Sequence, residues 1–274
     1  MTSELPVSRD LRVSYVLSWI IVVLMGTVSI LALLNQATIY PTEIIRQSFV
    51  ATDLINLFIG VPILIGSMWL TWRGKLLGLL FWPGALFYAA YHYIAYTFGV
   101  PVNLAFLFYL ILTALSTYAT VILISGIDWD AVKARLEGKL PIKYPAGLLV
   151  FFGFAFMLRV IWILLGDALG QTPVSPAELP VLVSDFLTLP AWIIGGVLLW
   201  QRRALGYVSS VGLLFQGSML FTGLIIFMAV QPLLTEAAFD LWGILLVAIM
   251  GMICFVPFGL SVRAVLISGQ EYNE

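Results

Sequence analysis

The sequence is poor in cysteine, histidine and charged residues. It has one cysteine and one histidine among 274 residues, and only 10% of its residues are charged. A single cysteine excludes an internal disulfide and the metal clusters held by several thiolates, and a single histidine cannot supply the usual ligands of haem or zinc. Soluble domains carry about 25% charged residues. A water-soluble fold with an ordinary charged surface is therefore excluded.

Sequence motifs for several kinds of chemistry are also missing. The chain contains no phosphate-binding GxxxxGK[ST] loop, no HExxH zinc motif and no GxSxG serine-hydrolase motif. Nothing in it is typical of nucleic-acid binding. We therefore expect no cofactor, no metal ion and no nucleic-acid partner.

Long apolar runs are what the sequence has instead. Hydrophobic residues make up 62% of the chain, and the mean hydropathy is +1.07. A membrane-crossing helix needs about 20 mostly apolar residues. Eight such runs occur, at 13–34, 51–72, 76–98, 102–127, 146–165, 181–200, 205–230 and 239–265. Because lipid offers the backbone no hydrogen bonds, and the runs are too long for barrel strands, the sequence predicts an all-α membrane protein with eight transmembrane helices.

The basic residues fall on one side of this predicted topology. Eleven of the thirteen lie before the first run, after the second, fourth and sixth runs, or near the end of the last: Arg9, Arg12, Arg73, Lys75, Lys133, Arg135, Lys139, Lys143, Arg202, Arg203 and Arg263. The positive-inside rule places such a side in the cytoplasm. We therefore expect a multipass protein of the cell (plasma) membrane, surrounded by the lipid bilayer, with both termini cytoplasmic.

An internal repeat relates the stretch TDLINLFIGVPILIGSMWLTWRGK to the later SDFLTLPAWIIGGVLLWQRR. Aligning the two matches three pairs of residues: Pro62 with Pro190, Trp72 with Trp200, and Gly78 with Gly206. The sequence thus predicts two four-helix repeats, residues 1–127 and 145–274. An even number of crossings in each makes the repeat parallel, with its axis along the membrane normal. The matched prolines could kink their helices and shape a central cavity.

The linker between the repeats, 128–144, has its own pattern. Trp129, Val132, Leu136 and Leu140 form an apolar stripe at helical spacing, with basic residues opposite. This pattern predicts a short amphipathic helix lying at the cytoplasmic headgroups.

Few ionisable residues fall within the predicted helices, and these lie toward the outer side. An arginine inside the membrane costs at least a few kcal/mol unless it is paired or reaches the headgroups, which makes Arg159 the most expensive side chain. Its depth favours Asp185 as the partner. Asp53, at the predicted outer edge of its helix, and the outer lipid phosphates are the alternatives.

A row of polar aromatic residues reaches the same level. Tyr88, His92 and Tyr96 are spaced by four and share one helix face, with Tyr91 beside them. An aromatic belt at the outer interface would also account for these tyrosines. The candidate ligand site comprises Asp53, Tyr88, His92, Tyr96, Arg159 and Asp185, with no catalytic or metal-binding residue assigned.

Four stretches resemble a group of uncharacterised prokaryotic multipass membrane proteins with eight helices. They are DLINLFIGVPILIGSMWLTWRGKLLGLLFWPGALFYAAYHY, VPVNLAFLFYLILTALSTYA, DWDAVKARLEG and VLVSDFLTLPAWIIGGVLLWQRRALGY. The resemblance covers nearly the whole chain and implies the eight-helix fold, but no activity. Members of that group often have a histidine shortly before the second aspartate, where this chain has VLV, so the resemblance does not support a metal site there.

Three functions are compatible with the sequence. The first is a transporter or ligand-binding bundle for a small molecule or ion, because ionisable residues within membrane helices mark ligand or ion paths. The second is a noncatalytic scaffold or subunit of a homo- or hetero-oligomer, favoured by the scarcity of polar residues. The third is a membrane enzyme acting on a lipid, with an outer carboxylate and His92 as acid and base.

Overall fold

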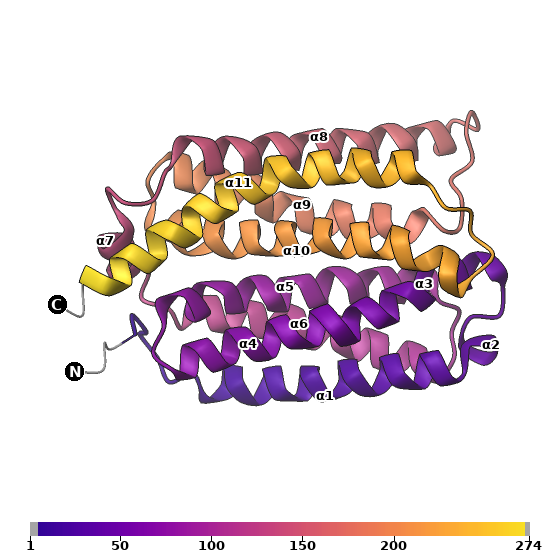
Figure 1. The fold of residues 1–274 in the computed structure, drawn as a ribbon, viewed down its shortest axis with the longest axis horizontal. Coiled ribbons are helices and arrows are strands. Elements are labelled where there is room, and N and C mark those ends of the chain that lie inside the picture. Colours follow the sequence, from indigo (N-terminus) through magenta and orange to yellow (C-terminus); the bar gives the residue numbers. More distant parts are fainter. Residues whose placement is uncertain (1–4, 272–274) are drawn as a thin grey trace.

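The computed structural model describes residues 5–271, and every element in this range is a helix (Figure 1). In chain order they are α1 (Arg12–Leu34), α2 (Gln36–Ile39), α3 (Glu43–Ile55), η1 (Asn56–Gly60), α4 (Val61–Trp72), α5 (Leu76–Gly99), α6 (Leu104–Ser125), α7 (Trp129–Leu136), α8 (Lys143–Ala168), α9 (Leu179–Trp200), α10 (Ala204–Leu234) and α11 (Leu241–Glu271).

Seven helices of the described chain are long and apolar enough to span a membrane, counting α3, η1 and α4 as one. This is the pattern of a multipass membrane protein. The remaining predicted crossing, 76–98, forms the 24-residue helix α5 but is not among the seven. Helix α5 contains no charged residue, and its mean hydropathy is lowered mainly by its four tyrosines, His92 and Pro83.

The polar character of α5 follows from its central position. This helix packs on α4 and α6 on one side and on α9 and α10 on the other. Most of its residues are buried, including Trp82, Tyr88, Tyr93 and Tyr96. Since α5 is largely enclosed by other helices, its side chains are selected for packing between helices rather than for contact with lipid.

The second predicted helix was wrong at its start: the helix begins at Glu43, eight residues before 51. Thr42 caps it, because its hydroxyl accepts a hydrogen bond from the Ile45 amide at 3.4 Å. The polar residues of the first turn are paired within the helix, with Arg46 Nη2 at 2.9 Å from Glu43 Oε2. These local contacts, rather than hydrophobicity, extend the helix toward its N-terminus.

The two matched prolines do not behave alike. Before Pro62 the backbone forms one π-helical turn, η1, in which the Val61 amide bonds to Asn56 O. Proline lacks an amide hydrogen and its ring presses on the preceding turn, and a wider turn relieves this clash. Pro190 lies inside the uninterrupted α-helix α9. Only the first proline is therefore accompanied by a change of helix type.

The linker helix α7 is held by protein on its apolar side. It is shorter than the predicted stripe, and it packs on α10 and α11. Val132 and Leu136 are buried, as is Leu140 beyond the end of the helix, while Trp129 is partly exposed. The apolar stripe therefore packs against the bundle, and the position of this helix at the cytoplasmic headgroups stays a prediction.

The turns between α4 and α5 and between α9 and α10 have the same geometry, 128 residues apart. Backbone bonds from 73 to 69, from 74 to 71 and from 75 to 70 recur from 201 to 197, from 202 to 199 and from 203 to 198. The middle residue has positive φ in both turns, 72° at Gly74 and 54° at Arg202. Arg202 is the one described non-glycine residue with positive φ.

Replacing Arg202 with glycine is expected to stabilise the protein by about 0.5–1 kcal/mol, because a side chain in the left-handed region is strained. The measurement is thermal unfolding in one detergent. The matched control is Arg203→Gly, where φ is −75°, and we expect no gain. Equal effects of the two substitutions would contradict this explanation.

Two groups of helices lie side by side in Figure 1. We call α1 and α3 to α6 the first helix group, and α8 to α11 the second helix group. They meet where α5 packs on α9 and α10, and where α10 packs on α3. At the α5–α10 contact a Cβ on Gly84 would overlap the carbonyl oxygen of Gly212, and one on Gly212 would lie 3.1 Å from Leu80 O. Gly84 and Gly212 are again 128 residues apart.

Candidate functional site

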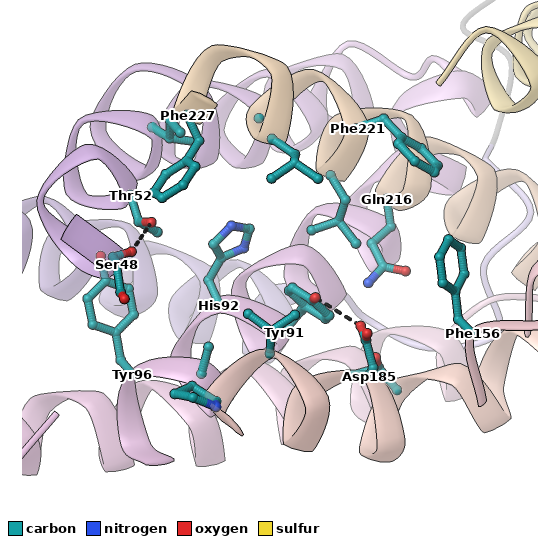
Figure 2. Close-up of a pocket in the computed structure, with 18 of the residues that line it drawn as sticks. Ser48, Thr52, Tyr91, His92, Tyr96, Phe156, Asp185, Gln216, Phe221 and Phe227 are labelled. Carbon is teal, nitrogen blue, oxygen red and sulfur yellow. Dashed lines mark hydrogen bonds between the residues drawn. The ribbon is translucent and has the colours of Figure 1, made fainter. Parts of the chain in front are cut away.

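A cavity of about 550 Å³ lies between the two helix groups (Figure 2). Its walls come from α3 and α5 of the first group and from α8, α9 and α10 of the second. A hydrogen bond from Gln231 Nε2 to Gln47 O, 2.9 Å long, joins the two groups beside it. The cavity therefore depends on how the groups dock, and neither group forms it alone.

Most of the cavity surface is apolar. Its aromatic and aliphatic walls include Phe49, Phe156, Phe221, Phe227, Leu189, Leu220 and Leu224. The described lining includes neither Pro62 nor Pro190, so these prolines do not form its surface directly. Polar groups are few, and Figure 2 shows Tyr91, His92, Asp185 and Gln216 around the same open space. An apolar wall with a few converging polar groups is the usual composition of a small-molecule site.

Arg159 lies at the cavity between two carboxylates. Its Nη2 is 2.7 Å from Glu178 Oε1, and its Nη1 is 4.0 Å from Asp185 Oδ2. The Tyr91 hydroxyl donates to Asp185 Oδ1 at 2.9 Å. Asp185, the partner that the sequence favoured for Arg159, does lie beside it. Glu178, which the sequence did not suggest, lies closer to Arg159 than Asp185 does. The Arg159 and Glu178 side chains are 45% and 37% exposed, whereas that of Asp185 is 15% exposed, so Asp185 is the enclosed member.

His92 presents one ring nitrogen toward the cavity. Its Nδ1 lies 3.0 Å from the backbone oxygen of Tyr88. A carbonyl oxygen only accepts, so Nδ1 carries the hydrogen and Nε2 of the neutral ring is an acceptor. The ring packs on Tyr88, with 4.2 Å between centroids, and edge-on against Tyr91. These contacts fix the ring plane and leave Nε2 as the polar atom available to a ligand.

Gln216 is a polar cavity residue that was not among the predicted site residues. Its Oε1 accepts a 2.8 Å hydrogen bond from Trp192 Nε1, which identifies the oxygen end of the amide because an indole nitrogen only donates. Its Nε2 is buried and has no hydrogen-bond partner among the described residues. The only signal in the sequence was a glutamine inside the apolar run 205–230.

The predicted site residues fall into two sets. Tyr96, His92, Arg159 and Asp185 line the cavity, whereas the described lining includes neither Asp53 nor Tyr88. Tyr88 lies behind His92, with its hydroxyl 3.2 Å from the place where a Cβ on Gly223 would be. The prediction therefore located one side of the cavity but included two residues from behind its wall.

The predicted position of Asp53 at the outer edge of its helix was wrong. Because α3 begins at Glu43, Asp53 lies ten residues along it, about 15 Å at the rise of an α-helix. Its side chain is buried within the first helix group. It accepts hydrogen bonds from Tyr40 at 2.6 Å and Tyr96 at 2.9 Å, and no ion pair joins it to Arg159 in the described structure.

Among the described residues, no group of three or more histidine, cysteine, aspartate and glutamate side chains could hold a metal ion. No family model, curated protein or solved structure matches the chain. The chemistry of this site therefore has to be inferred from its own residues.

Proposed function

We propose that this protein binds a small amphiphilic molecule in the cavity between its helix groups, as a transporter or ligand-binding bundle of the membrane. The observation that supports this most is Gln216, whose Nε2 is buried at the cavity without a partner. A buried donor without an acceptor is costly, by about 1–3 kcal/mol. A ligand with an acceptor atom at this place would remove that cost.

The polar groups around Gln216 define the end of the ligand that they would bind. Gln216 Nε2 requires an acceptor, whereas His92 Nε2 and the Asp185 carboxylate require donors. A hydroxyl or amide group can satisfy both kinds. The apolar walls favour an aliphatic or aromatic body behind that polar end, and the volume falls in the range of about 300–1,000 Å³ typical of small-molecule sites.

We also propose that α5 is an eighth crossing and that the bundle is a parallel repeat of two four-helix halves, divided at the linker 128–144. The repeated turns after α4 and α9 support this, as does the meeting of Gly84 with Gly212 at the contact between the halves. The basic turns at 73–75 and 201–203 would then face the cytoplasm with both termini. The cavity would lie toward the outer side of the plasma membrane.

The scaffold and enzyme alternatives receive less support. A scaffold does not account for an unpaired amide beside a cavity of this size. An enzyme would need converging acid and base groups that are free to react. Asp53 is enclosed by Tyr40 and Tyr96 behind the cavity wall. Asp185, which lines the cavity with His92, is already paired with Tyr91 and Arg159. Ligand binding accounts for more of the described polar contacts.

Filling the cavity is expected to abolish co-purification of its ligand. Ala95 lines the cavity on α5, and Ala95→Phe would place a ring in it without changing Gln216, Asp185 or His92. Small molecules are extracted from protein purified in mild detergent and compared by mass spectrometry. We expect at least one amphiphilic compound to be enriched in the wild type and depleted at least tenfold in Ala95→Phe.

The control variant is Leu158→Phe, which adds a ring on a face of α8 that is 64% exposed. It should retain the compound at the wild-type level. If no compound distinguishes the wild type from Ala95→Phe, or if both variants lose it equally, the proposed function is wrong.

A further inference from the structure

Asp53 is a buried acid without a basic partner in the described structure. Asp53 is 1% exposed, and it lies inside the first helix group, ten residues after the start of α3. The groups around it are the hydroxyls of Ser29 on α1, Tyr40 before α3, Tyr93 and Tyr96 on α5, and Tyr109 on α6. No arginine, lysine or histidine is among these neighbours.

An ionised carboxylate in such surroundings is expensive, because neither water nor a cation offsets its charge. It therefore either binds a cation or is neutralised by a proton. The tyrosine hydroxyls are compatible with protonation of Asp53, because they can form hydrogen bonds with both its ionised and its neutral form. Tyr40 and Tyr96 can both donate to the ionised group, which stabilises it for short periods, and a neutral carboxyl can itself donate to Tyr40.

Tyr40 allows both arrangements because it has a second partner. Its hydroxyl lies 2.6 Å from Asp53 Oδ2 and 3.3 Å from the Tyr109 hydroxyl. When Asp53 is ionised, Tyr40 donates to it. When Asp53 carries a proton on Oδ2, that proton is donated to Tyr40, and the hydroxyl hydrogen of Tyr40 turns toward Tyr109. Burial and the Asp53 carboxylate raise the pKa of Tyr40 well above its ordinary range, so this hydroxyl keeps its own hydrogen.

The hydrogen-bond donors at Asp53 favour a proton over a metal cation, because the Tyr40 and Tyr96 hydroxyls each donate to one of the carboxylate oxygens. Asn56, three residues after Asp53 in the π-helical turn, has neither its Nδ2 nor its Oδ1 hydrogen-bonded, and the Tyr93 hydroxyl is unpaired as well. Amide N–H groups do not coordinate a metal cation, whereas hydroxyl and amide oxygens can. A mixture of unpaired donors and acceptors is instead satisfied by hydrogen-bonded hydroxyls or water, and π-helical turns are frequent at functional sites.

We propose that Asp53 is a proton-binding site in the membrane interior, and that Tyr96 links its protonation state to the cavity. Tyr96 donates its hydroxyl to Asp53 Oδ1 while also lining the cavity. Release of the proton to water strengthens this hydrogen bond, because bonds to a charged acceptor are stronger than neutral ones, and so holds the cavity wall more firmly. Proton binding at Asp53 is independent of the proposed ligand, whereas its effect on ligand binding rests on the proposed function.

The test is infrared spectroscopy of the protein in lipid nanodiscs. The wild-type spectrum minus that of Asp53→Asn should contain the carbonyl band of a protonated carboxyl group at neutral pH. This band should decrease in alkaline buffer and should not change when Na⁺ replaces K⁺ at constant pH. A difference spectrum with only ionised-carboxylate bands at neutral pH, or a band that responds to Na⁺, would overturn the proton site.

Two further variants test the link to the cavity. In Tyr96→Phe the band should persist to buffers about one pH unit more alkaline, because the ionised form loses a charge-assisted hydrogen bond. Ala95→Phe, next to Tyr96 at the cavity wall, should shift the frequency of the band, while Leu158→Phe on the exposed face of α8 should not. An unchanged band in Ala95→Phe would overturn the link.

This experiment and the co-purification experiment can fail separately. If the infrared spectra show no protonated carboxyl band from Asp53, the co-purification comparison of wild type with Ala95→Phe is unaffected. Absence of a co-purifying compound would refute the proposed function and leave the infrared band as evidence of a proton site.

Discussion

Gly84→Ala is expected to destabilise the protein by about 3 kcal/mol or more, and to lower its melting temperature by about 5–10 °C. The added Cβ would overlap the carbonyl oxygen of Gly212. This contact is between two helix backbones, so no side chain can rotate away to relieve it. The α5–α10 contact would have to open, and the cavity that depends on it would change shape. Thermal unfolding in a single detergent gives the measurement.

Two other glycine variants provide a graded control. Gly212→Ala should have a smaller effect, because its Cβ would lie 3.1 Å from Leu80 O and 3.3 Å from Gly84 N, contacts that need a shift of only a few tenths of an ångström. Gly66→Ala in α4 meets nothing within 4 Å. It should be neutral or slightly stabilising, because alanine favours a helix over glycine. If all three variants lost stability equally, the steric explanation would be refuted.

Changing Gln216 is expected to affect both ligand binding and stability. In Gln216→Leu the buried Trp192 indole loses its acceptor, so we expect a loss of about 1–3 kcal/mol in stability together with loss of the ligand. Gln216→Glu has nearly the same shape and keeps an oxygen for Trp192. Because an ionised carboxylate is costly at this buried position, its carboxyl is expected to be protonated and to offer an O–H donor where glutamine has its NH₂ group. It should therefore keep more stability and more of the co-purified ligand than Gln216→Leu.

The measurements are the melting temperature and the mass-spectrometric amount of the compound bound by the wild type. Ser209→Ala is a suitable control, since Ser209 lies on the same helix α10 and bonds only to the Leu205 carbonyl in its own helix, at 2.8 Å. It should change neither quantity much. Full ligand retention in Gln216→Leu would show that the Gln216 amide does not recognise the ligand.

The apolar runs were sufficient to predict the helices. Hydrophobic length is a local property, so all eight predicted segments form helices, seven of them apolar enough to span a membrane. Helix ends were less predictable where polar contacts decided them, as at Thr42 and Glu43. The status of α5 as a crossing, the repeat, the division at 128–144 and the cytoplasmic termini stay predictions.

The candidate site was predictable only in part. Tyr96, His92, Arg159 and Asp185 were found because ionisable and polar aromatic residues are rare in an apolar chain, and they do line one cavity. Glu178, the nearer partner of Arg159, lies in the connection before α9, and its position depends on how that loop folds.

Residues close together in the chain were enough to predict that it is helical, where its helices lie and which few of their side chains are polar, because these are local properties. The positions of Asp53 behind the cavity, of the unpaired Gln216 amide facing it and of Tyr96 in contact with both Asp53 and the cavity could be known only from the folded protein. These relations depend on the docking of helices from distant parts of the chain. That docking is set by backbone contacts such as Gly84 with Gly212, which hydrophobic periodicity does not specify.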